Sequence, residues 1–348
     1  MNSVATPLSE ARERAERSTK LLVVNESIEH AQVLDLTSYI SSEDVVVVND
    51  AATLPASFRG MHAGTGASIE IRLLMNLKNE REWRVVVFGE GDWRTPTEKR
   101  APAPKLIAGD QLFLGDFLKA IVTRVHQDIS DRLVDVKLEP KDVPLWQAIY
   151  RSGRPIQYSY LKEDLHSWDQ QTIFSGPPVA LEPPSAAFPL SWELVFRLLN
   201  KGVHIVSLTH ATGVSDTGDR AINRRLPFPE RSRIPHETQR AILKARSGGK
   251  KVWAIGTGVT RALETWGGRA HGTPVDAEFI SNLKITPETK LGVVDGILTG
   301  LHEAGASHLS LLHAFIAERK LNQAYAEAKA RGYLWHEFGD VCLIEKET

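Results

Sequence analysis

Apolar residues along this chain are grouped in two different ways. Near the start and after about Pro144, short apolar runs that predict β-strands alternate with segments of helical spacing. Val45–Val48 is entirely apolar, as in a strand covered on both faces. The strands predicted in these parts are Leu21–Asn25, Val45–Val48, His204–Leu208, Val252–Ile255 and Val341–Ile344. Strands that alternate with helices indicate an α/β domain.

Helix signals fall between these strands. Ser191 can cap a helix that runs to Lys201, and Pro235 can open one that ends at Ser247 before a glycine pair. Helical spacing also resumes after Gly256. Further helices are predicted in the charged opening segment and over Val294–Glu303, Ser307–Arg319 and Leu321–Arg331.

The middle of the chain has a different pattern, with short strand-like pieces separated by turn residues. The candidates are Ile69–Met75, Trp83–Phe88, Gln111–Phe113, Leu118–Val125 and Leu133–Leu138. Many short strands with little helix predict a small barrel or sandwich. We therefore predict a large α/β domain, with flanking helices on a mixed or barrel-like sheet, formed by residues 1–60 and 145–348. An inserted small all-β barrel domain is predicted at residues 61–144.

Composition narrows the class of protein. The chain has 348 residues, of which 42% are hydrophobic and 24% charged, and this is typical of soluble globular proteins. Its net charge of −1 gives no overall attraction to nucleic acid or anionic membrane, although a local basic patch stays open. No signal peptide and no apolar stretch of about 20 residues is present, so we expect no membrane partner. The single cysteine, Cys342, is expected to be a buried strand residue and fits a cytoplasmic protein.

A polar corner follows the strand Val252–Ile255, before the helical pattern resumes. It consists of Gly256, Thr257, Gly258, Val259, Thr260 and Arg261. One interpretation is a tight strand-to-helix turn whose glycines serve backbone geometry. The other is a donor pocket formed by helix N-terminal amides, the threonine hydroxyls and the guanidinium. The Gly-x-Gly spacing alone does not distinguish these two interpretations, since the full dinucleotide-binding fingerprint is absent.

Several segments, in order, carry a resemblance to a known family. They are DVVVVNDAATLPASFRG, QQTIFSG, PSAAFPLSWEL, LLNKGVHIVSLTH, IPHETQRAILKARSGGKKVWAIGTGVTRALET, VVDGILTGLHEAGASHLSLLHAF and FGDVCLI. In this order, over almost the whole chain, they resemble the S-adenosylmethionine:tRNA ribosyltransferase-isomerases of queuosine biosynthesis. The resemblance implies a large α/β domain interrupted by a small β-barrel, in agreement with the apolar pattern.

The resemblance also implies an activity. S-adenosylmethionine would serve as a ribosyl donor, and the acceptor would be the aminomethyl group of a 7-deazaguanine in tRNA. Adenine and methionine would leave, and neither a metal nor a second cofactor would take part. Such a site has to hold a cation, move protons and stabilise a departing purine with side chains and backbone alone.

Departures from the family's motifs concentrate at polar positions. The family corner usually has the sequence Gly-Thr-Thr-Ser-Val-Arg, of which Gly256, Thr257 and Arg261 are kept. Pro189 stands where the family has a histidine, and only Glu230 is kept of a His-Ser-Glu motif. A small-molecule acceptor, or elimination from the donor, is therefore an alternative function. A binding protein without catalysis is a further one.

Four other residues are candidates for catalysis. His302, beside Thr299, and His210, at the end of a strand, are either structural or act as a proton shuttle or purine contact. Asp50 ends a buried strand, where it can cap a turn or face a cleft. Glu230 is either one member of a solvated ion pair or catalytic.

The remaining candidates concern metals and stacking. His308 and His313, five residues apart, do not share a helix face, and no Cys/His cluster is present, so we expect no metal site. Tyr158 and Tyr160 could stack on a purine.

The family assignment orders the candidates by role. Gly256, Thr257, Gly258, Thr260, Arg261 and Thr299 would bind the donor, and His302, Glu230, His210 and Asp50 would be catalytic. For this assignment to hold, we expect Thr257, Arg261 and His302 to converge on one cavity large enough for a nucleoside.

Overall fold

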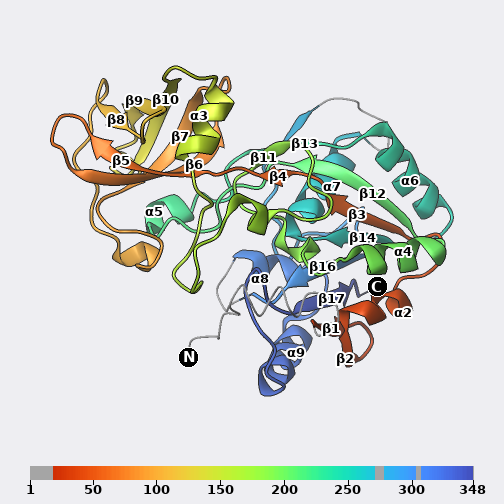
Figure 1. Ribbon diagram of the computed structural model, residues 1–348. Coiled ribbons are helices and arrows are strands. Elements are labelled where there is room, and N and C mark those ends of the chain that lie inside the picture. Colours follow the sequence, from red (N-terminus) through yellow and green to blue (C-terminus); the bar gives the residue numbers. More distant parts are fainter. Residues whose placement is uncertain (1–18, 271–277, 303–306, 348) are drawn as a thin grey trace.

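A large mixed sheet and a closed barrel lie side by side in the computed structural model (Figure 1). The structure describes residues 19–270, 278–302 and 307–347. The helix predicted in the opening segment falls almost wholly on residues 1–18, outside the described part. No helix of the described residues is long and apolar enough to cross a membrane.

Within the described residues, the large sheet has nine strands in the order β15-β13-β12-β3-β14-β16-β17-β1-β2. In that order their bounds are Phe279–Ser281, Glu230–Arg233, His204–His210, Val45–Asn49, Val252–Ile255, Gly296–Gly300, Val341–Glu345, Lys20–Val24 and Ile28–Gln32. The central strands β12, β3, β14 and β16 run parallel to one another, whereas β17 is antiparallel to β16. The predicted apolar runs thus form strands of this sheet, and those of β3 and β14 are buried along their whole length.

Helices cover both faces of this sheet. Val45 and Val47 belong to one apolar cluster with residues of α6 (His236–Ser247), α7 (Thr257–Ala270), α8 (Ser307–Leu312) and α9 (Glu318–Ala330). Val46 and Val48 pack on the opposite face with α2 (Leu36–Tyr39), α4 (Trp192–Asn200) and the 3-10 turn η4 (Ser185–Ala187). The alternation along β3 therefore divides the core into two layers.

Two helix predictions were wrong. The segment Val294–Glu303 contains strand β16, which pairs with β14 and β17, because a central position in the sheet outweighs local helical spacing. A Cβ on Gly296 would lie 2.2 Å from the ring of Trp253, so this strand position is fitted to a neighbouring side chain. The predicted helix Ser307–Arg319 ends at Leu312, and α9 begins at Glu318.

The middle of the chain forms a closed barrel rather than a sandwich, in the order β10-β7-β6-β5-β8-β9. The strands, in chain order from β5 to β10, are Ser57–His62, Ser68–Asn76, Glu82–Phe88, Gln111–Phe113, Leu118–Val125 and Leu133–Pro140. Its interior is a separate apolar cluster, which α3 (Leu145–Ser152) joins from outside the barrel. The division of the chain into domains at residues 60 and 145 stays a prediction.

A short parallel pairing connects the two parts. It joins β4 (Ala52–Thr53), just after β3, to β11 (Pro178–Ala180). The helix α5 (Arg220–Asn223) and the 3-10 turns at Val33–Asp35, Thr97–Lys99 and Ser167–Gln170 complete the described elements.

Candidate active site

The ends of the parallel strands bring several predicted residues to one edge of the sheet. Asp50 follows β3, His210 ends β12, Gly256 follows β14 and Thr299 lies near the end of β16. In parallel sheets this carboxyl-terminal edge is where ligands usually bind. The fold therefore gathers residues that the sequence holds far apart.

Glu230, His210 and Arg261 form a buried cluster at this edge. The guanidinium of Arg261 donates to the Glu230 carboxylate, and His210 Nε2 lies 3.1 Å from the same oxygen. The backbone N–H of Gly213 donates to the other oxygen at 2.7 Å. His210 Nδ1 lies 2.8 Å from the Ser232 hydroxyl, which fixes the ring. Glu230 is 5% exposed and His210 is fully buried, so these polar groups face one another away from bulk water.

The electrostatics of Glu230 follow from this arrangement. Burial alone would raise the pKa of its carboxyl group. The charges of His210 and Arg261, with hydrogen bonds from His210 and the Gly213 N–H, outweigh burial and lower the pKa to about 2. Glu230 is consequently ionised at neutral pH and holds the side chains of Arg261 and His210 in place.

His302 and His308 form a second group. His302 Nε2 lies 2.9 Å from the Thr299 hydroxyl, and its ring stacks on that of His308 with centroids 5.1 Å apart. Burial, followed by the charges of His308 and His336, lowers the pKa of His302 well below its usual value. Burial and the charge of Arg261 lower the pKa of His308 to about 4. Because Arg261 acts on His308, the second group lies within electrostatic range of the first.

The corner after β14 is a tight turn at the start of α7. Gly256 has a φ of +95°, a conformation that favours glycine, and the Thr260 hydroxyl donates back to its carbonyl at 3.2 Å. Gly258 lies against His210, where a Cβ would come within 2.8 Å of the ring. Thr257, the first residue of α7, is partly exposed. Backbone geometry thus explains Gly256, close packing against His210 explains Gly258, and Arg261 is the corner residue whose side chain belongs to the buried cluster.

Asp50 is held differently. Its carboxylate accepts hydrogen bonds from the hydroxyls of Ser207, at 3.1 Å, and Thr209, at 2.7 Å, both on the neighbouring strand β12. These contacts tie β3 to β12. They do not connect Asp50 with the cluster of Glu230.

Sequence reasoning missed a further pair of acids, which are half-buried. Tyr158 donates to Glu182, and Tyr160 donates to Glu337. The two rings stack with centroids 5.8 Å apart, and the ring of His336 lies 4.1 Å from that of Tyr160. The tyrosines were visible as candidates, but no local pattern in the sequence points to their acidic partners.

These acids differ in charge state from Glu230. Burial raises the pKa of Glu182 to about 7, and the charge of Glu337 adds to the effect, against hydrogen bonds from Tyr158 and Ser215. Oε2 of Glu337 is buried and has no hydrogen-bond partner among the described residues. Since His336 also lowers the pKa of His302, this group adjoins the histidine pair.

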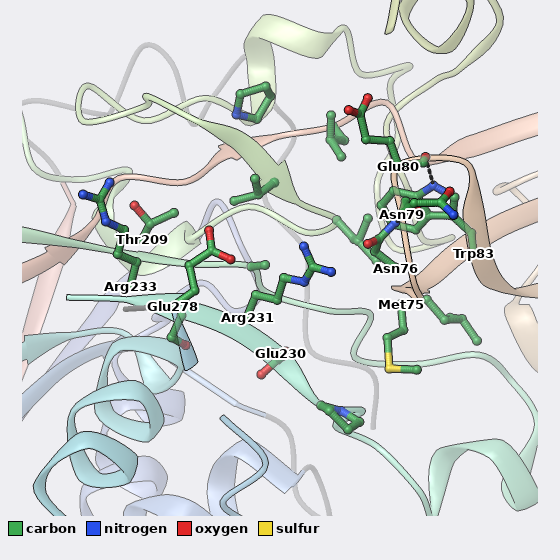
Figure 2. Close-up of a pocket in the computed structure, with 18 of the residues that line it drawn as sticks. Met75, Asn76, Asn79, Glu80, Trp83, Thr209, Glu230, Arg231, Arg233 and Glu278 are labelled. Carbon is green, nitrogen blue, oxygen red and sulfur yellow. Dashed lines mark hydrogen bonds between the residues drawn. The ribbon is translucent and has the colours of Figure 1, made fainter. Parts of the chain in front are cut away.

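A cavity of about 460 Å³ lies between the barrel and the edge of the large sheet (Figure 2). The barrel contributes Asn76, Asn79 and Trp83, and strand β13 contributes Glu230 and Arg231. Figure 2 shows Arg231 and Glu278 extending into the space between these two walls. Thr257, Arg261 and His302 do not line this cavity, so the predicted convergence of those three is absent here. Of the predicted site residues, Glu230 is the one that reaches it.

The fold and the buried groups together define a class of protein. A mixed α/β sheet with an inserted barrel carries ionised and proton-binding side chains at the ends of its parallel strands, as enzymes do. The chain matches the family model described as "Queuosine biosynthesis protein" over residues 4–344. It belongs to that family.

Curated relatives match along nearly their whole length. The S-adenosylmethionine:tRNA ribosyltransferase-isomerase of Sorangium cellulosum (strain So ce56) is 32% identical over 329 residues, which are 91% of this chain and 88% of the relative. The protein of the same name from Gloeobacter violaceus is 28% identical, covering 95% and 90%. The crystal structure of S-adenosylmethionine tRNA ribosyltransferase from Thermotoga maritima matches at 24% identity with a TM-score of 0.48, covering 93% and 92%.

Proposed function

We propose that the protein is an S-adenosylmethionine-dependent transferase-isomerase that moves a ribosyl-derived unit onto a 7-deazaguanine in tRNA, within queuosine biosynthesis. Relatives with this name match along almost their full length. The observation that supports catalysis most directly is the buried cluster of Arg261, Glu230 and His210, because fixed charges away from water act strongly on a reacting group. Since tRNA is its proposed substrate, we also place the protein in the cytoplasm.

The donor would bind at the corner after β14. Arg261, at the exposed edge of the buried cluster, is suited to a carboxylate or a departing purine, and the first turn of α7 offers backbone N–H groups. The sulfonium of the donor needs negative charge nearby. Glu337 fits this need, since one of its buried oxygens lacks a hydrogen-bond partner among the described residues. The adjoining rings of Tyr160 and His336 would pack against the donor's apolar surface.

Proton transfer is assigned on the basis of pKa. A general acid or base works best when its pKa is near the working pH. Burial raises the pKa of Glu182 to about 7, so Glu182 would transfer the protons. His302, whose pKa burial holds well below the usual value, stays neutral and would bond to the departing purine. Glu230 would remain ionised and orient Arg261.

The acceptor base would enter the cavity beside Glu230. Its volume of about 460 Å³ suits a ligand of nucleoside size. The amides of Asn76 and Asn79 can bond to base edges, and Trp83 offers an aromatic wall. Glu80 or Glu278 can hold an aminomethyl cation.

The two alternative functions are less favoured. Those relatives are named for action on tRNA, which speaks against a small-molecule acceptor. A binding protein without catalysis would have no need of a buried carboxylate shared by an arginine and a histidine, which is costly to assemble.

Adenine release tests the proposal. Purified protein is incubated with S-adenosylmethionine, with and without tRNA that carries the aminomethyl-deazaguanine, and adenine and methionine are quantified. We expect release only with the modified tRNA, and its loss in an Arg261→Met variant. Release that is independent of tRNA would favour the small-molecule alternative, and absence of release together with absence of donor binding would favour the non-catalytic one.

A further inference from the structure

A second cavity, of about 440 Å³, lies where the barrel meets the segment Gly153–Trp168. Arg59 on β5 and Arg72 on β6 contribute its barrel side, and Arg154 and Trp168 come from the opposite segment. None of these residues lines the cavity of Figure 2. The two cavities are therefore separate sites. The first half of strand β6 lines the second cavity, and the last residues of β6 line the cavity of Figure 2.

The floor of this second cavity carries excess positive charge. Arg72 and Arg100 share one carboxylate, that of Glu70, with N–O distances of 2.7 and 2.8 Å. Arg72 is 1% exposed, and its Nη1 has no hydrogen-bond partner among the described residues. Arg132 lies over the same Phe88 ring as the other two guanidinium groups. Asp219 and Asp216 attract Arg132, but Arg72 and Arg100 share a single carboxylate and so leave one positive charge that an anion would balance.

The repulsion among these arginines is visible in one of them. Burial lowers the pKa of Arg132 and the charge of Asp219 opposes this effect, while the charges of Arg100 and Arg72 lower the pKa further. The lining acid Asp164 does not neutralise the floor, because Arg94 and the indole N–H of Trp93 already occupy its two oxygens. The cavity is thus cationic although the chain as a whole is not.

The rim combines charge with an exposed aromatic surface. Trp168 is 67% exposed, and His166 stacks on its ring at 4.4 Å with the planes 15° apart. Arg154 is exposed at the same rim, and its charge helps lower the pKa of Asp164. A stacking ring beside arginines is the combination with which proteins bind single nucleotides of an RNA strand, the base on the ring and the phosphate on the cations.

We propose that this second cavity binds one nucleotide of the RNA substrate other than the reacting one. The base lies on Trp168 and the phosphate faces Arg154 and the buried Arg72, with Arg59, which pairs with Asp92 at 3.3 Å, at the same side. The inference rests on the proposed action on tRNA, since the cavity recognises a nucleoside phosphate and the RNA is the proposed source. A free mononucleotide has the same chemistry, so the experiment contains an arm for it.

Binding of a fluorescently labelled tRNA transcript, followed by anisotropy without S-adenosylmethionine, tests the proposal. Trp168→Ala is expected to weaken affinity roughly tenfold, the usual size of one base–aromatic stack. Arg154→Ala is expected to reduce the slope of log affinity against log salt by about one, as for one lost phosphate contact. The matched controls are Trp192→Ala, exposed on α4, and Arg240→Ala, exposed on α6, which should behave as wild type.

The outcomes separate this inference from the proposed function. If Trp168→Ala and Arg154→Ala match their controls in RNA affinity and salt slope, the cavity does not bind RNA and the inference is overturned. It is also overturned if AMP, GMP, CMP or UMP binding depends on Trp168 whereas RNA binding does not. If wild type releases no adenine but RNA affinity still falls with Trp168→Ala, the proposed function fails and the RNA site stands.

Discussion

Gly258 lies so close to the imidazole of His210 that a Cβ at this position would be 2.8 Å from Cδ2 of the ring. The ring cannot easily turn away, because Nδ1 lies 2.8 Å from the Ser232 hydroxyl and Nε2 lies 3.1 Å from Glu230. Contact of α7 with the buried cluster therefore depends on the absence of a side chain at this corner.

Gly258→Ala is accordingly expected to displace His210. An extra methyl group in a tightly packed site costs about 1–3 kcal/mol of unfolding free energy, and the displaced ring should lower adenine release as well. Gly268→Ala is the control in the same helix, because a Cβ there meets nothing within 4 Å. It should raise stability by about 0.5–1 kcal/mol, since alanine favours helix over glycine. Urea unfolding of both variants measures these free energies. Equal changes in the two variants would contradict the predicted clash with His210.

Glu230 should make the protein sensitive to acid. Its pKa in the folded protein is about 2, below the ordinary 4.5, because His210 and Arg261 favour the ionised form. Its stabilising contribution is present above about pH 4.5 and is lost as the pH falls through about 2. This pKa difference of about 2.5 between the folded and unfolded states corresponds to about 3 kcal/mol of unfolding free energy.

Glu230→Gln removes this titration. We expect the variant to lose less stability than wild type between pH 4.5 and 2, measured by denaturant unfolding at each pH. Glu237→Gln, an exposed acid on α6, should keep the wild-type slope. A Glu230→Gln slope equal to that of wild type would show that folding does not lower the pKa of this carboxyl group.

Much of the sheet was predictable because its central strands are buried on both faces. All the residues of β3 and β14 are buried, and such strands must be apolar along their length. Strand β16 is also buried but was predicted as part of a helix, because its sequence Gly-Ile-Leu-Thr-Gly has no continuous apolar run. Gly296 is needed there because the ring of Trp253, on the neighbouring strand, leaves no room for a side chain. A contact of this kind between distant residues produces no periodic pattern in the sequence.

The site was predictable in its parts but not in its connections. Glu230, His210 and Arg261 were separate candidates in the sequence. The strand order places β13 beside β12, and as a result His210 and Arg261 both contact the carboxylate of Glu230. The partner acids of the tyrosines were invisible, because Tyr158 is 24 residues from Glu182 and Tyr160 is 177 from Glu337. The second cavity likewise joins distant segments.

Glu182 should titrate near neutral pH. Burial and the charge of Glu337 raise its pKa to about 7, against a hydrogen bond from Tyr158. A raised pKa means that the contribution to stability is present below about pH 4.5 and is lost as the pH rises through about 7. Glu182→Gln should therefore lose less stability than wild type between these values.

Tyr158→Phe tests the same acid by a different measurement. The substitution removes a hydrogen bond that lowers the pKa of Glu182, so the midpoint of its titration should move upward. The infrared band of the protonated carboxylic acid, assigned by its absence in Glu182→Gln, reports that midpoint. The ring stack with Tyr160 is kept by phenylalanine. An unchanged or lower midpoint would contradict the hydrogen-bond assignment.

His308 should belong to the active site, although the family motifs did not indicate it. Its ring stacks on His302, and its charge helps lower the pKa of His302, after burial. His308→Ala removes that repulsion and opens the site to water, and both changes raise the pKa of His302. Proton NMR of the His302 ring should show the shift, and adenine release should fall, by about 100-fold where the pair acts in proton transfer to the purine. Ser310→Ala, exposed on the same helix, should change neither quantity. A His302 titration that is unaffected by His308→Ala would separate the two rings electrostatically and confine His308 to a structural role.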